Sequence, residues 1–229
     1  GVCSEHFLPP ISLTVPEAIQ IFLASRLLIQ FSRRWNLDVA NLFLKLARTV
    51  PEALKKEINN TAAWMQRLPA DPRLNKQLAD IAQAWISRRK VKISYRSFEA
   101  ENPDSRIIEP YFIEPAAAGR SSYVIAFCNL KNQIRTFKVE RIESVFILDE
   151  KYEIPQEFSA DAYLSPAIGI LVTGQEATEV KLRFSPGLSR IIKESIWHPS
   201  QQLTRESDGS LVMTICVNET PELMTWILG

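Results

Sequence analysis

The chain has 229 residues and carries 27 Lys and Arg against 26 Asp and Glu, which gives a formal net charge of +1. Hydrophobic residues make up 46% and charged residues 23%, a composition that is ordinary for a soluble globular protein and excludes a largely disordered chain. The three cysteines lie far apart without a CxxC pair, so no disulfide framework or zinc site is indicated and a reducing cytoplasm is expected. The longest apolar run, Ala18 to Ile29, is broken by polar residues and is shorter than the ~20 residues that a bilayer requires, so no membrane association is expected.

Residues 1–90 have the pattern of a helical region, which we expect to act as a linker or dimerisation element. Thr14 and Glu17 have the spacing of a capping box, and a helix that is apolar around most of its circumference follows. This helix is predicted to be buried, either within its own domain or against a second copy of the chain. Three further helices are predicted, with Thr49 expected to cap the third and Asp71 the fourth.

Charge is distributed unevenly along the chain. Residues 1–90 carry 13 Lys and Arg against 7 Asp and Glu, whereas residues 151–229 carry 6 against 10. A basic front fits a segment that lies close to nucleic acid, but it fits a solvated helical surface as well. Trp35, Trp64 and Trp85 leave a similar choice between a stacking platform and core positions, and their places in apolar stripes favour the core.

From residue 91 the apolar pattern changes to a period of two, which is typical of β-strands. Residues 91–150 are therefore predicted to form one β-domain with short polar turns. Its strands are expected at residues 91–96, 106–114, 122–128, 133–139 and 143–148. Five short strands with tight turns favour a small β-barrel.

Residues 151–177 are predicted to form a short helix and a linker that contains Gly169 and Gly174. Residues 178–229 follow in the order β-α-β-β-α, which favours a small ferredoxin-like domain. That order stops before the last strand of such a domain, so its final edge is expected to be missing or supplied by another chain. The fold class predicted for the whole chain is α+β.

The segment from Gln133 to Ile142 holds two arginines and an aromatic residue at fixed spacing. Arg135 and Phe137 have the same parity on a predicted strand and so point to one face, and Arg141 follows at the exit of the strand. Two guanidinium groups beside an aromatic ring can bind a phosphate or a nucleobase. The alternative is that both arginines pair with nearby carboxylates, for which the candidates are Glu109, Glu140 and Glu143.

This segment resembles the WYL domain family of bacterial transcription regulators. The Trp-Tyr-Leu position that names the family falls on Ser122-Tyr123-Val124, so only the tyrosine is kept. The segments 91–96 and 106–111 resemble the opening strands of the family, and the segments 180–184 and 197–202 resemble the extension domain that follows WYL domains. The resemblance therefore covers residues 88–229 in order.

The resemblance implies a five-stranded barrel of Sm type that senses an effector, in a homodimeric regulator that binds operator DNA through a helix-turn-helix. No helix-turn-helix is evident in the sequence, so the chain is expected to be the sensing and dimerising part. The expected effector is a nucleotide or single-stranded nucleic acid. The expected site has three cations for phosphate, Arg106, Arg135 and Arg141, and three aromatic rings that border the base, Tyr95, Tyr123 and Phe137.

No catalytic pattern accompanies these residues. His6 and His198 have no catalytic spacing, and the GxSxG, P-loop, GxGxxG, HExxH and EF-hand patterns are absent. We therefore expect no enzymatic activity, no cofactor and no metal. Two other interpretations stay open: a barrel that serves as a protein interaction module without a ligand, and a metal-dependent nuclease whose carboxylates hold Mg²⁺.

Overall fold

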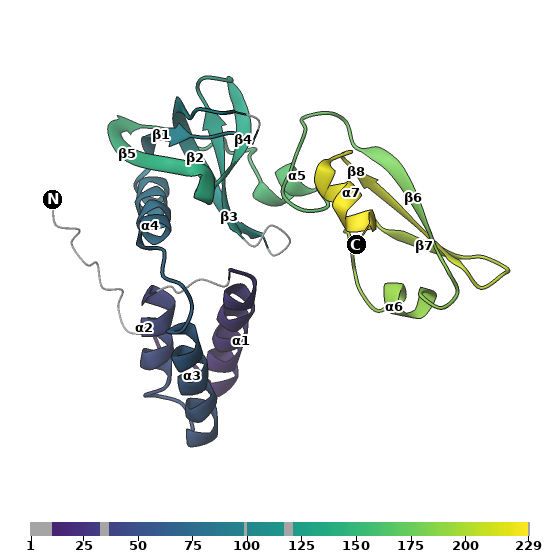
Figure 1. Ribbon diagram of the computed structural model, residues 1–229, viewed down its shortest axis with the longest axis horizontal. Helices are drawn as coiled ribbons and strands as arrows, with labels where there is room; N and C mark the ends of the chain where they lie inside the picture. The colour runs from purple at the N-terminus through teal and green to yellow at the C-terminus, as the bar shows by residue number, and fades with distance from the viewer. Residues whose placement is uncertain (1–10, 33–36, 99, 117–120, 229) are drawn as a thin grey trace. The chain divides into compact units, whose positions relative to one another are not determined.

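A computed structural model describes four stretches of the chain: residues 11–32, 37–98, 100–116 and 121–228 (Figure 1). The chain divides into two compact units, residues 1–72 and 73–229. The predicted mixture of helices and strands is confirmed, with one five-stranded and one three-stranded antiparallel sheet. Within the four described stretches, no helix is long and apolar enough to cross a membrane.

The first unit contains three helices: α1 (Val15–Ser32), α2 (Leu37–Leu46) and α3 (Glu52–Met65). The predicted capping box is confirmed, because the Glu17 carboxylate accepts hydrogen bonds from the backbone N–H and the hydroxyl of Thr14, both at 2.7 Å. The predicted cap of α3 is wrong. The Thr49 hydroxyl donates to the carbonyl oxygen of Leu46 in the preceding turn, and α3 begins directly after Pro51 without a side-chain cap.

These three helices share one apolar core, in which the rings of Phe22 and Phe43 lie 5.4 Å apart. Helix α1 is nevertheless not buried on all sides, because Leu23, Leu27 and Leu28 are 49%, 54% and 49% exposed. Burial of the whole helix within its own domain was therefore the wrong expectation for these three leucines. Contact with a second copy of the chain stays a prediction.

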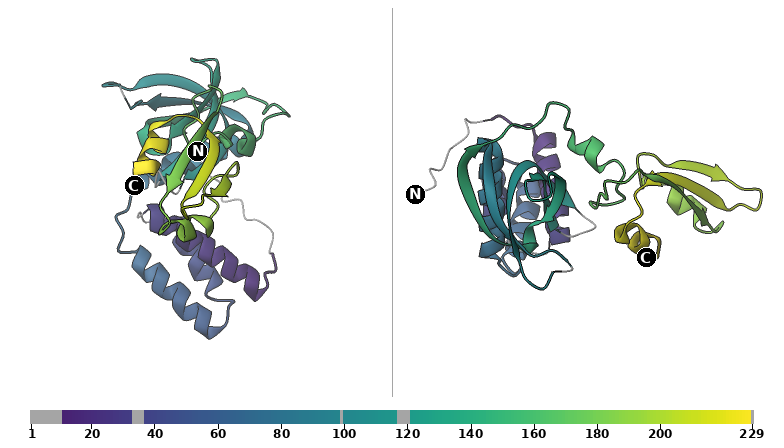
Figure 2. Two further views of the ribbon diagram at one scale, coloured as in Figure 1. Left: turned by 90° about the vertical axis from the view of Figure 1, so that its right-hand side faces the viewer. Right: turned by 90° about the horizontal axis from the view of Figure 1, so that it is seen from above.

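The second unit contains a five-stranded sheet in the order β4-β3-β2-β1-β5, which Figure 2 shows from two further directions as a strongly curled layer. Its strands are β1 (Arg89–Tyr95), β2 (Asp104–Ala116), β3 (Ser121–Cys128), β4 (Gln133–Lys138) and β5 (Ile142–Lys151). A short 3-10 helix, η1 (Val139–Arg141), connects β4 to β5. These two strands are the edges, and in the described part of the chain no ladder joins them. The predicted closed barrel is thus corrected to an open sheet.

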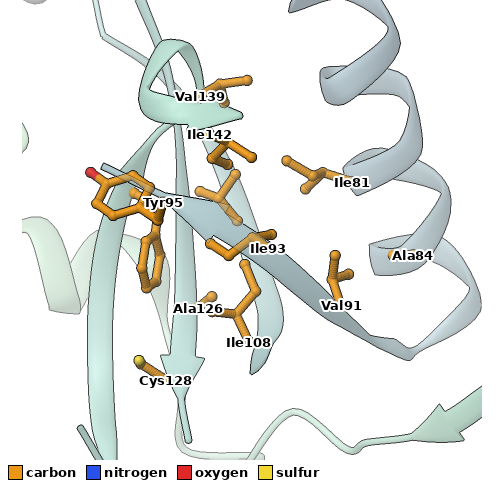
Figure 3. Packing of buried hydrophobic residues seen from close by; sticks show 12 residues of the cluster. Ile81, Ala84, Val91, Ile93, Tyr95, Ile108, Ala126, Cys128, Val139 and Ile142 are labelled. Carbon is orange, nitrogen blue, oxygen red and sulfur yellow. The ribbon is translucent and has the colours of Figure 1, made fainter. Parts of the chain in front are cut away.

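Helix α4 (Pro72–Ser87) covers the core face of this sheet. Figure 3 shows Ile81 and Ala84 of α4 pointing towards Val91, Ile93 and Ile142 of the strands. Each of these five residues is at most 1% exposed. Removal of their apolar surface from water, at about 25 cal/mol per Å², holds the helix against the sheet.

The C-terminal part follows the predicted order from its first strand onwards. Its elements are α5 (Ala160–Leu164), β6 (Thr178–Phe184), α6 (Ser189–Lys193), β7 (Gln202–Arg205), β8 (Leu211–Val217) and α7 (Pro221–Leu228). The three strands pair in the order β6-β8-β7, and the described residues contain no fourth strand of this sheet. As predicted, Thr220 caps the last helix, since its hydroxyl accepts the N–H of Leu223 at 3.3 Å.

The linker before β6 is attached to α7. The Glu222 carboxylate accepts the N–H groups of Ile170 and Leu171, each at 2.8 Å. A Cβ atom on Gly169 would lie 2.7 Å from the same carboxylate, so a larger residue at this position would require the Glu222 side chain to shift. These bonds attach this part of the linker to α7.

His198 is a buried residue of the same domain, at 4% exposure, and its Nδ1 lies 2.8 Å from the hydroxyl oxygen of Ser200. Burial lowers the pKa of His198 below its ordinary value of 6.5, because desolvation penalises the imidazolium form. Backbone groups of Ser165 and Ala167 act in the opposite direction and do not outweigh it. The unfolded chain therefore binds this proton more readily than the folded protein.

Replacement of a core residue of α4 should destabilise the protein far more than replacement of an exposed residue on the same helix. Ile81 is 0% exposed and Ile86 is 74% exposed. We expect Ile81→Ala to lower the free energy of unfolding by about 2–5 kcal/mol and Ile86→Ala to change it by less than about 1 kcal/mol, measured by urea denaturation. Equal losses in the two variants would contradict the packing of α4.

The stability of the protein should depend on pH through His198. Because the folded pKa is depressed, stability is fully present above pH 6.5 and falls as the pH drops below that value, until the folded pKa is reached. Urea denaturation of the wild type and of His198→Gln at pH 7.5 and pH 5.5 measures this dependence. The loss at pH 5.5 should be smaller in the variant, and an identical loss in both proteins would rule out the role of His198.

Candidate functional site

The junction between β4 and β5 borders a cavity of about 380 Å³, here called the Arg141 cavity. Its walls come from the first turn of α4, the loop after β1, η1 and the start of β5. The lining residues are Arg73, Arg96, Ser97, Phe98, Ala100, Glu140, Arg141 and Glu143. Three arginines, two glutamates and one aromatic ring therefore meet around a single hollow.

Arg141 is held by its backbone and by an aromatic ring. Its carbonyl oxygen accepts the N–H of Arg96 at 3.0 Å, which ties η1 to the end of β1. Its guanidinium carbon lies 5.3 Å from the ring centroid of Phe98, a residue that is 84% exposed. Such a cation is attracted by the ring quadrupole. Arg141 forms no salt bridge with any described residue, so its charge lines the cavity without a carboxylate of its own.

Arg96, in contrast, is paired with a carboxylate. Its Nε donates to Oε1 of Glu143 at 3.1 Å, and its Nη2 donates to the same oxygen. The two side chains are 53% and 37% exposed, so their pairing is worth only about 0–1 kcal/mol and can rearrange around a ligand. The second carboxylate of the cavity, Glu140, accepts a hydrogen bond from the hydroxyl of Ser121 on β3.

The third arginine reaches the cavity from another part of the chain. Nη1 of Arg73, in the first turn of α4, donates to the carbonyl oxygen of Ile142 at 3.1 Å. One turn later, Nε2 of the buried Gln77 donates to the same oxygen at 2.7 Å. Two donors on one carbonyl compensate for its removal from water. This contact fixes the start of α4 beside η1 and brings Arg73 to the cavity.

The charge and shape of the cavity suit a phosphate-bearing ligand. Three guanidinium groups against two carboxylates leave the lining with a net charge of +1. Planar guanidinium donors match phosphate oxygens, and an exposed aromatic ring can stack on a base. The volume of about 380 Å³ lies within the range of ~300–1,000 Å³ that is usual for small-molecule sites.

Three of the residues predicted for the site lie together in the core of the sheet instead. The rings of Tyr95 and Phe137 meet edge to face at 5.1 Å, and the guanidinium of Arg106 lies 5.1 Å and 5.8 Å from their centroids. Asp104 pairs with Arg106 through two bonds of 2.7 and 2.9 Å, which lowers the pKa of the carboxyl and raises that of the guanidinium. Tyr95 and Phe137 are 6% and 1% exposed, so their faces are already covered.

The other two predicted residues lie elsewhere on the sheet. Arg135 is exposed on β4 and forms no salt bridge with any described residue. Tyr123 is 8% exposed on β3, and the Lys138 ammonium lies 5.9 Å from its ring centroid. Burial raises the pKa of Tyr123, since desolvation penalises the phenolate. Of the six residues predicted for the site, only Arg141 lines the cavity.

The carboxylates proposed as alternative partners are engaged by other groups. Glu109 pairs with Lys90 at 3.3 Å, while Glu143 pairs with Arg96 and Glu140 binds Ser121, as described above. Neither Arg135 nor Arg141 pairs with any of these three glutamates. Arg73 and Phe98 were not predicted as site residues. The signal for Phe98 in the sequence is an aromatic residue next to a predicted polar turn.

A second cavity of about 380 Å³ lies in the first unit and is lined by Arg26, Glu57, Asn60, Thr61 and Trp64. Nη1 of Arg26 donates to the hydroxyl of Thr61 at 2.6 Å. Trp64 is 38% exposed, so the core position predicted for it is only partly correct. Trp85 packs edge to face against Phe112 at 5.7 Å as a core residue would, and Trp35 lies outside the described residues.

Comparison with known proteins identifies two domains in the chain. Residues 76–147 match the WYL domain and residues 176–229 match the WCX domain. Among solved structures, the chain is similar to Proteasome accessory factor B/C (PafBC) of Arthrobacter aurescens, with 15% sequence identity and a TM-score of 0.37. That match covers 96% of this chain and 32% of the other, so the chain spans about a third of the length of that protein. No curated protein matches the chain.

Two of the predicted arginines should differ in their effect on stability. Arg106→Ala removes the partner of Asp104 and the cover of two buried rings, so we expect the free energy of unfolding to fall by about 1–3 kcal/mol. Arg135→Ala changes an exposed side chain and should alter it by less than about 0.5 kcal/mol. Urea denaturation measures both, and an equal effect would contradict the structural role of Arg106.

Proposed function

We propose that the chain is the ligand-sensing part of a transcription regulator and that the Arg141 cavity binds a nucleotide or single-stranded nucleic acid. One observation carries this proposal. Arg141 lines the cavity without a carboxylate partner among the described residues, beside two further arginines and the exposed ring of Phe98. The WYL and WCX domains support a regulatory sensing role.

Within this proposal the aromatic contact with the base belongs to Phe98. Tyr95 and Phe137 had been expected to stack, but each ring is covered by the other and by Arg106. Phe98 is 84% exposed and sits beside a guanidinium, so a base can approach its ring at little cost. Arg141 and Arg73 then supply positive charge for the phosphate.

A ligand in this cavity would be connected to α4 through hydrogen bonds. Binding at Arg141 acts on η1, and the carbonyl group of Ile142 next to it is bonded to Arg73 and Gln77 of that helix. A ligand that favours one position of α4 shifts the population of that state. In this way, binding of a ligand in the cavity would change the position of the helix that precedes the sheet.

The finer features of the regulator are part of the same proposal. The open five-stranded sheet would be an Sm-type scaffold and the three-stranded sheet a ferredoxin-like one. The regulator would be a bacterial, cytoplasmic homodimer. It would bind operator DNA through a helix-turn-helix outside these 229 residues.

The exposed face of α1 favours a second candidate function, a protein interaction module. Leu23, Leu27 and Leu28 are each about half exposed, and clustered apolar side chains on a surface often mark contacts with other proteins. The two functions are compatible, because the leucines lie in the first unit and the cavity lies in the second. If the protein binds no nucleotide, this second function is the one that remains.

Fluorescence anisotropy of labelled single strands tests the proposed function at two salt concentrations. Binding should weaken as salt rises, because bound arginines displace counterions from the phosphates. Arg141→Ala should reduce affinity at least about tenfold, whereas Arg205→Ala, an exposed arginine on β7, should leave it unchanged. Unchanged binding in Arg141→Ala, with both variants folded, would refute the role of this cavity.

A further inference from the structure

We infer that the Arg141 cavity selects guanine, so that its ligand is a guanine nucleotide or a single strand that presents a guanine base. This inference rests on the proposed function, because it assigns the base that the same cavity accepts. It is carried by the ion pair between Arg96 and Glu143, which lies at the cavity together with the exposed Phe98.

The ion pair leaves one donor atom and one acceptor atom available to a ligand. Arg96 uses Nε and Nη2 to bind Oε1 of Glu143. Its Nη1 and the Oε2 atom of Glu143 have no hydrogen-bond partner among the described residues. Both side chains line the cavity and are partly exposed, so a ligand can reach these two atoms without first burying a charge.

Guanine matches this arrangement along one edge. The base presents the O6 acceptor followed by the N1–H and N2–H donors, so an arginine N–H can bind O6 while a carboxylate accepts the two N–H groups. The bonds to Glu143 are charge-assisted and therefore stronger than bonds between neutral groups. A guanine that meets both side chains would bind Arg96 through O6 and Glu143 through N1–H and N2–H, with Oε1 of Glu143 still bound to Arg96.

The other bases leave at least one of these groups without a partner. Adenine and cytosine place a ring-nitrogen acceptor beside a single amino group, which reverses the order of donor and acceptor. Uracil begins like guanine but ends in the O2 acceptor, which would face the carboxylate of Glu143 and be repelled by it. A polar group left unpaired in a site is costly, so the 2-amino group of guanine is the feature that decides.

Stacking adds a preference for a purine. The guanidinium of Arg141 lies 5.3 Å from the ring centroid of Phe98, and most of that residue remains exposed to solvent. A purine offers the larger surface to this ring. With Arg96 engaged by the base, Arg73 and Arg141 are left for the phosphate.

Calorimetric titration of the full chain with GMP, IMP, AMP and UMP tests this inference. GMP should bind about tenfold more tightly than IMP, which lacks only the 2-amino group, and more tightly still than AMP and UMP. A second titration compares an oligothymidylate strand that contains one guanine with a strand that contains none. Tighter binding of the strand with guanine would support guanine selection, and its affinity relative to that of GMP shows whether a strand or a free nucleotide is preferred.

Two matched variants locate the selection. Glu143→Gln removes the negative charge but keeps the shape, so it should abolish the tenfold preference for GMP over IMP and leave AMP binding unchanged. Glu150→Gln, which changes an exposed glutamate of the same strand, should keep the preference.

The outcomes separate this inference from the function on which it rests. Equal binding of all four nucleotides that is lost in Arg141→Ala would overturn guanine selection and leave the proposed function intact. A preference for GMP that survives in Glu143→Gln would also overturn the inference, because Glu143 would not be its source. No binding of any nucleotide or strand would overturn both.

Discussion

The carbonyl oxygen of Ile142 is the contact on which the candidate site depends. It accepts hydrogen bonds from Arg73 and Gln77, which lie one turn apart at the start of α4. The same helix covers the sheet with Ile81 and Ala84, so one buried acceptor sets both where α4 begins and which face it presents. This contact is the hydrogen bond that holds Arg73 beside the residues of η1.

At the end of β4, an edge strand of the open sheet, a side chain rather than a neighbouring strand accepts a backbone N–H. The Lys138 N–H at the end of β4 lies 3.4 Å from the hydroxyl oxygen of Tyr95, to which it donates. The Tyr95 ring in turn packs against Phe137, and Arg106 covers both rings. The Lys138 N–H and the two rings are thus satisfied at this point without a bond between β4 and β5.

Much of the fold could be predicted because its signals are local. The capping box of α1, the five strands and the Thr220 cap depend on residues a few positions apart, and each is found near where it was expected. Strand parity was also predicted correctly, since Arg135 and Phe137 pair with Ala126 and Val124 two positions apart on β3. Parity alone does not say how far a sheet curls. Phe137 is buried, while Arg135 remains exposed on the same strand.

The site itself could not be predicted in full because its residues are brought together by tertiary contacts. Arg73 and Arg141 are far apart in sequence and meet only through the carbonyl group of Ile142. The sequence also could not tell which arginines have carboxylate partners. Asp104 holds Arg106 and Glu143 holds Arg96, whereas Arg135 and Arg141 have no salt bridge with any described residue and only Arg141 of these two lines the cavity.

An arginine held over an aromatic ring without a counterion keeps its charge available for a ligand. Neutralisation of Arg141 by a protein carboxylate would make a phosphate compete with that carboxylate, and part of the binding energy would be lost in breaking the existing pair. The contact with Phe98 positions the guanidinium without neutralising it. The ion pair that lines the same cavity, Arg96 with Glu143, is partly exposed and weak, so it can adapt to a base while remaining paired. Arg141 is therefore suited to bind the phosphate, and the Arg96–Glu143 pair is suited to bind the base, because Arg141, unlike Arg96, has no carboxylate partner among the described residues.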